Sequence, residues 1–135
     1  MTLEQTIQER WLADTALAAL VPSERVFTSF APAEAARPRV VIERRKSVPK
    51  LRGSGGLRVD AVELAFVVEA ESYDAAALIV AAIGAEFDEA DFNAGEGYVA
   101  VMRRGDELRE RKAGDVAERE AVRWELKYEI TLCLN

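Results

Sequence analysis

The chain has 135 residues, half of them hydrophobic and 31% charged, which suffices for one folded domain and argues against a chain that stays disordered. Its 24 acidic and 18 basic residues give a net charge of −6, which works against nonspecific binding to nucleic acid or anionic lipid. Histidine is absent, which excludes imidazole acid–base catalysis, Ser-His and Cys-His nucleophile pairs and His-based metal sites. We therefore expect a single domain over residues 1–135.

A helix is predicted from the first residues up to Pro22, which cannot continue the hydrogen-bond ladder. Thr2 and Gln5 have the spacing of a capping box, in which each side chain satisfies a backbone N–H of the first turn. Apolar residues at helical spacing form a buried face that consists of Leu3, Ile7, Trp11, Leu17 and Val21. A second apolar stripe, a candidate partner surface, lies on the opposite face and consists of Leu12, Ala16 and Leu20.

Two strands and two loops are predicted next. Residues 25–28 are predicted to form a short strand, and a second strand begins at residues 40–42. The Ala- and Pro-rich segment 31–38 is the loop that connects them. The segment 44–57 is first basic and then glycine-rich, so we expect a long polar hairpin loop. A solvated loop and a protein-docking loop both remain open for its basic residues Arg44, Arg45, Lys46, Lys50 and Arg52.

Residues 62–70 alternate apolar and polar side chains, which predicts a strand paired with the one before the loop. Ser72 is placed to cap a second helix, with Asp74 in its first turn. Its predicted buried face consists of Tyr73, Ala76, Ala77, Val80, Ile83 and Phe87. An acidic turn over 88–95 then leads to a strand at 98–102.

The hydrophilic segment 103–120 is predicted as a second long polar hairpin loop, either solvated or a docking arm. Its candidate interface residues are Arg103, Arg104, Arg109 and Arg111. The final segment, 122–134, alternates without interruption and predicts a long, well-paired strand. The fold class is therefore α+β, with two helices on one face of a mostly antiparallel sheet of four to five strands.

No segment completes a catalytic or ligand motif. The glycines at 53–56 lack the Lys that a phosphate-binding loop requires. Residues 91–95 begin like a calcium-binding EF-hand loop, but the match does not continue. Glu96 stands where the loop requires glycine, and Met102 stands where it requires a bidentate Glu. Cys133 has no intrachain disulfide partner and alternates with core residues, so a thiol nucleophile is disfavoured. We expect no catalytic residue, cofactor or metal.

The order of three segments carries a resemblance to a known family. Residues 17–27 end a helix in Ala-Leu-Val and enter an Arg-Val-Phe strand, and a loop then leads to the Pro-x-Val strand of residues 37–42. The strand-to-helix junction at 68–76 contains Ser-Tyr-x-x-Ala. This succession, which with the last strand covers nearly the whole chain, resembles the tail-completion family of tailed phages.

The resemblance implies a tail terminator or a related neck protein, a hexameric ring that caps the tail tube, stops its polymerisation and meets the head connector. It implies the major tail tube protein and the head-completion or connector protein as partners. The location would be the virion tail or neck, after assembly in the host bacterial cytoplasm. No basic start and no membrane-length apolar run occur, so no membrane partner is expected. No specific nucleic-acid partner is expected either. A head-completion or minor tail protein, or a small cytoplasmic ligand-binding or regulatory domain, remains the alternative.

Overall fold

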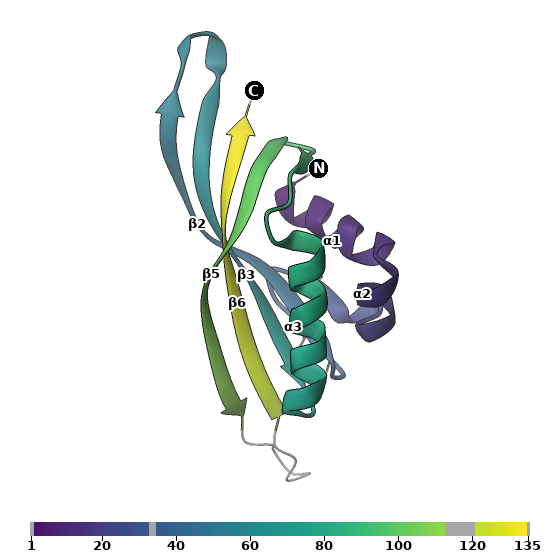
Figure 1. Ribbon diagram of the computed structural model, residues 1–135. Coiled ribbons are helices and arrows are strands. Elements are labelled where there is room, and N and C mark those ends of the chain that lie inside the picture. Colours follow the sequence, from purple (N-terminus) through teal and green to yellow (C-terminus); the bar gives the residue numbers. More distant parts are fainter. Residues whose placement is uncertain (1, 33–34, 113–120, 135) are drawn as a thin grey trace.

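The computed structural model describes residues 2–32, 35–112 and 121–134, in which three α-helices cover one face of a curled six-stranded sheet (Figure 1). The helices are α1 (Leu3–Ala13), α2 (Thr15–Leu20) and α3 (Tyr73–Phe87). The strands are β1 (Val26–Thr28), β2 (Arg39–Arg52), β3 (Arg58–Ala70), β4 (Phe92–Ala94), β5 (Gly97–Lys112) and β6 (Ala121–Leu134).

The strand order in the sheet is β1-β2-β3-β6-β5-β4. Only β1 and β2 run parallel among these pairs, so the predicted α+β class with a mostly antiparallel sheet is confirmed. The predicted counts of two helices and four to five strands were too low. β4 was not predicted, because three residues inside the acidic turn are too few to show alternation.

The N-terminal helix is broken at Asp14, so the prediction of one continuous helix was wrong. The Asp14 backbone is extended, and its carboxylate accepts a hydrogen bond from the Leu17 N–H at 3.0 Å. An Asp that caps a new helix in this way competes with helix continuation. The capping box is confirmed, since Thr2 and Gln5 exchange both bonds, at 3.2 and 2.8 Å.

The predicted hairpin between β2 and β3 is confirmed, but its loop is much shorter than the expected 44–57. β2 continues to Arg52 and pairs there with Arg58 at the start of β3, so the turn spans only 53–57. Backbone pairing outweighs the charged composition, because β3 is itself paired with β6 along its whole length. Gly55 and Gly56 lie at φ of 81° and 87°, a conformation that favours glycine in this turn.

The second predicted loop, 103–120, was also too long. β5 continues through its charged residues to Lys112, which pairs with Ala121 at the start of β6. The remaining residues of that loop, 113–120, lie outside the described part of the chain. The last strand is long and well paired, as its pattern predicted, and it lies between β3 and β5.

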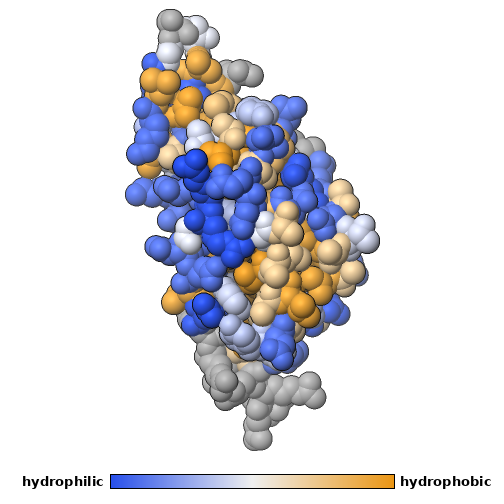
Figure 2. Space-filling model, viewed as in Figure 1, coloured by the Kyte–Doolittle hydropathy of each residue, from blue (hydrophilic) through white to orange (hydrophobic). Residues whose placement is uncertain are grey.

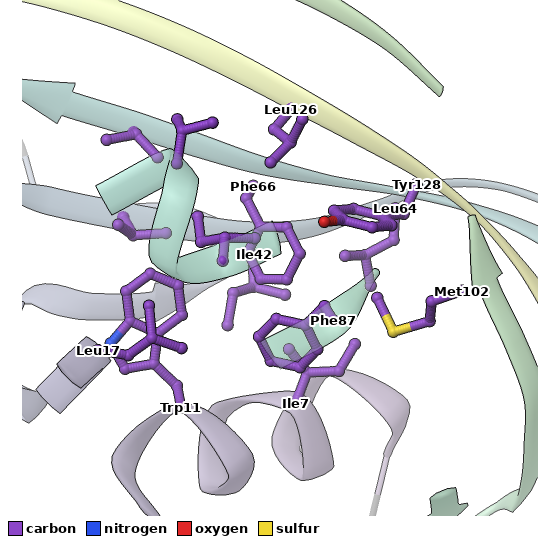
Figure 3. Packing of buried hydrophobic residues seen from close by; sticks show 14 of the residues in the cluster. Ile7, Trp11, Leu17, Ile42, Leu64, Phe66, Phe87, Met102, Leu126 and Tyr128 are labelled. Atoms are coloured by element: carbon purple, nitrogen blue, oxygen red, sulfur yellow. The ribbon is translucent and has the colours of Figure 1, made fainter. Parts of the chain in front are cut away.

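The core lies between the helices and the inner face of the sheet (Figure 3). Phe66 of β3 stands near its centre, with ring centroids 6.1 Å from Trp11, 5.2 Å from Phe87 and 5.7 Å from Tyr128. Ser72 caps α3 as predicted, by accepting from the Ala75 N–H at 3.1 Å. The predicted inner residues of α3 are covered except for Tyr73, which is 49% exposed. No helix in the described residues is long and apolar enough to cross a membrane.

Candidate functional site

Three of the predicted interface arginines form ion pairs within their own chain. The first is Arg44, whose guanidinium lies 2.8 Å from the Glu4 carboxylate and 3.0 Å from that of Glu96. Glu96 also accepts the Leu3 N–H at 2.6 Å. Arg44 therefore ties β2 to the start of α1 and to the β4–β5 turn. Burial opposes its charge, but the two carboxylates raise the pKa of Arg44 above its usual value.

The second is Arg45, on the outer face of the sheet, which no helix of the described residues covers (Figure 1). Arg45 pairs with the buried carboxylate of Glu125, which also accepts from Arg123 at 3.1 Å. The hydrogen bond from Arg45 lowers the pKa of Glu125, and Arg123 adds to this effect. These contacts join β2 and β6 across the intervening β3.

The third is Arg104, which lies across α3 because Gly84 leaves room for it. A Cβ at Gly84 would be 2.2 Å from the Arg104 Nη2 atom. Arg104 pairs with Asp88 at 3.2 Å, and the Tyr128 hydroxyl donates to the same carboxylate. Burial and Asp88 raise the pKa of the Tyr128 hydroxyl. A glycine in the last turn of a helix beside a distant arginine gives no local sequence signal, so this packing could not be predicted from the sequence.

The remaining arginines of β5 differ in exposure. Arg103 is 70% exposed, with one long contact of 3.8 Å to Glu89. Arg109 lies 4.7 Å above the Trp124 ring and donates to the Tyr73 hydroxyl at 3.0 Å. The Arg111 side chain lies outside the described part of the structure. The predicted set thus combines arginines with short ion pairs to their own chain, such as Arg44, and a largely exposed one, Arg103.

The rest of the predicted basic set does face outward. We call residues 45–58, the end of β2, the turn and the first residue of β3, the arm. Lys46, Lys50 and Arg52 are exposed on it, and Leu51 and Leu57 expose 58% and 47% of their surface. Figure 1 shows the turn of this hairpin projecting past the end of β6. The arm is therefore a basic surface with exposed leucines.

The helices form a second candidate surface, which we call the helical layer and which consists of residues 2–20 and 71–91. Leu12 is 39% exposed and Ala16 is exposed, whereas Leu20 is half-buried against the core. These three do not form the predicted single stripe, because the break at Asp14 places them on two helices. The structure adds Leu78, which is 61% exposed on α3. In Figure 2 apolar atoms gather over α3 and again over the hairpin end, with polar atoms between them.

The described residues offer no enclosed chemical site. One open hollow of about 410 Å³ lies between the arm and the end of β6, with a lining that includes Arg52, Leu57 and Glu96. Arg58 also lines it, but its guanidinium is engaged by Asp60 at 3.0 Å. No cluster of metal-binding side chains occurs among the described residues. The exposed features are surfaces, which suit contacts with other proteins.

A family model described as tail completion protein gp17 matches residues 5–132 of the chain. The chain belongs to this family. The resemblance stated from the sequence is thereby confirmed. A search of curated proteins found no match.

A similar fold occurs in a chain of the solved structure described as "Virion of native gene transfer agent (GTA) particle". The two chains superpose with a TM-score of 0.72 at 18% sequence identity, over 98% of this chain and 95% of the other. At this identity the match shows a shared fold. Together with the family, it supports assignment of the chain as a structural tail protein of phage type.

Proposed function

We propose that this protein is a tail terminator, a subunit of a ring that caps the finished tail tube, ends its polymerisation and joins the tail to the head connector. Its place would be the neck of the virion, reached by assembly in the host bacterial cytoplasm. The ring would be a hexamer, as the family resemblance implies. Its partners would be the major tail tube protein and the head-completion or connector protein, and its role would involve no catalysis.

One observation carries the proposal: the chain presents two outward surfaces of different chemistry, the basic arm and the helical layer. A closed ring needs a heterologous interface, in which one patch of each subunit meets a different patch of its neighbour. Two unlike surfaces on separate parts of the molecule satisfy this requirement. The outer face of the sheet, which no helix of the described residues covers, adds a further area for axial partners.

The test combines electron microscopy with deletion of the gene. Purified protein should form rings, and rings mixed with isolated tail tubes should sit at the tube ends. Particles lacking the protein should carry tails of uncontrolled length. A protein that never binds tube ends, and whose deletion leaves tail length normal, contradicts the proposal. Normal tail length with particles that lack a head-to-tail joint would instead indicate a head-completion role.

A further inference from the structure

The arm and the helical layer carry charges of opposite sign. The arm has five basic residues and no acidic one, whereas the helical layer has nine acidic residues and one basic residue. Both surfaces also expose apolar side chains: Leu51 and Leu57 on the arm, and Leu78 on α3. Opposite charge around apolar centres is the pattern of two surfaces that fit each other.

We propose that the arm of one copy docks on the helical layer of the next copy. The contact is head to tail, so each copy gives its arm to one neighbour and its helices to the other. This inference deepens the proposed function and rests on it, because the contact would repeat around the proposed ring. The committed partner is a second copy of this chain, because the same molecule supplies both complementary surfaces.

The charges on the arm that point outward are available for a partner. Among the described residues, Lys46, Lys50 and Arg52 have no ion pair or side-chain hydrogen bond. The other basic residues of the arm, Arg45 and Arg58, are held by carboxylates of their own chain. Three free cations on a narrow hairpin give a strong local positive potential.

The helical layer offers matching free anions. Glu9, Glu71 and Asp74 are exposed, and within the described part of the chain they too have no ion pair. Asp74 and Leu78 are four residues apart on α3, so they share one face of the helix. Ala81 and Ala85 continue that exposed side with small side chains, which leave room for leucines of a partner. The adjoining α2 carries no charge.

The arm is built for contact through side chains and not for adding a strand. β1 covers the edge of β2 only up to Ile42, but beyond it the edge carries Pro49 and two irregularities of register. Prolines, lysines and bulges on an edge block strand pairing. Because β6 pairs with β3 as far as Arg58, the arm is also stiff, which lowers the entropy lost on docking.

Charge reversal tests the contact. The arm variant is K46E/K50E/R52E, the layer variant is E9K/E71K/D74K, and far-UV circular dichroism verifies that each is folded. E9K/E71K replaces the triple layer variant if D74K weakens the start of α3. By sedimentation velocity, each variant alone should need at least about tenfold more protein than wild type to associate. An equimolar mixture should associate again, because each variant then supplies the surface that the other has lost.

Wild-type association of the arm variant, or a mixture that associates no better than its components, overturns the arm contact. So does a wild type that stays monomeric. The tube-binding assay separates this inference from the proposed function. If the rings cap tubes and the charge-reversal variants still associate like wild type, only the proposed contact is refuted. If association depends on charge but the protein does not bind tubes, only the terminator role is refuted.

Discussion

β2 and β3 pass through two regions that differ in what covers them. Where the helices lie over the sheet, Val40, Ile42 and Phe66 are fully buried. Beyond Arg44, which meets the start of α1, every residue of β2 except half-buried Val48 is exposed. The pairing of the two strands continues across both regions. The difference indicates that the covered region stabilises the fold and that the arm is free for recognition.

The largest effect should come from emptying the centre of the covered region. Phe66→Ala removes a ring that touches three other aromatic side chains, so the free energy of unfolding should fall by about 3–5 kcal/mol. Leu51→Ala, at an exposed position of the same sheet, should change it by no more than about 0.5 kcal/mol. Urea unfolding measures both. Equal losses would show that the arm also stabilises the fold.

The boundary between the regions should be the next most sensitive place. Arg44→Met leaves Glu4 and Glu96 without their shared cation, and we expect a loss of about 1.5–3 kcal/mol in the free energy of unfolding. Lys46→Met, two residues further along β2, is the matched control and should be nearly neutral. A comparable loss at Lys46 would contradict the boundary at Arg44.

The ion pairs of the outer face predict a dependence on pH. Because Arg45 lowers the folded-state pKa of Glu125, that carboxylate stabilises the fold above its unfolded pKa of about 4.3. The contribution is lost as the pH falls through the lower, folded pKa. The urea midpoints of wild type and Glu125→Gln should therefore differ at pH 7 and converge in acid. Glu129→Gln, at an exposed position of the same strand, should follow wild type throughout.

A smaller loss in the free energy of unfolding is expected when the hydrogen bond between Tyr128 and Asp88 is removed. Tyr128→Phe keeps the ring in the core and removes only the hydroxyl that donates to Asp88, so the cost should be about 1 kcal/mol. Arg104 still pairs with Asp88 and limits the loss. Thermal unfolding followed by circular dichroism measures the change. A loss as large as that of Phe66→Ala would show that the hydroxyl organises the core.

The smallest effect on stability belongs to the arm. K46E/K50E/R52E changes three exposed side chains without ion partners among the described residues, so the free energy of unfolding should move by no more than about 0.5 kcal/mol. The same variant should lose self-association. A variant that unfolds more easily in proportion to its lost association would remove the distinction between the regions.

The sequence predicted those elements whose pattern is local. The Thr2 capping box, the Ser72 cap and the alternating strands at 62–70 and 122–134 depend on neighbours within a few residues, and all four are confirmed. Strand lengths at 44–52 and 103–112 were missed, since pairing with distant strands overrides a polar composition.

The candidate surfaces were only partly predictable. Basic residues that face outward and those that bind internal carboxylates look alike in sequence, as Lys46 and Arg45 show. Which of them is free depends on acids far along the chain, such as Glu125. Leu78 was missed because α3 is apolar nearly all round, and no periodicity marks its exposed side.

Site-specific disulfide formation tests the docking of the arm most directly. In a C133S background, L51C on the arm is mixed with L78C on α3, and L51C with L108C on exposed β5 is the control. A disulfide requires Cα atoms within about 7 Å, so only surfaces in contact are joined. The account predicts a covalent dimer between L51C and L78C and little between L51C and L108C. Equal yields from both mixtures, or no L51C–L78C product from protein that still self-associates, would contradict it.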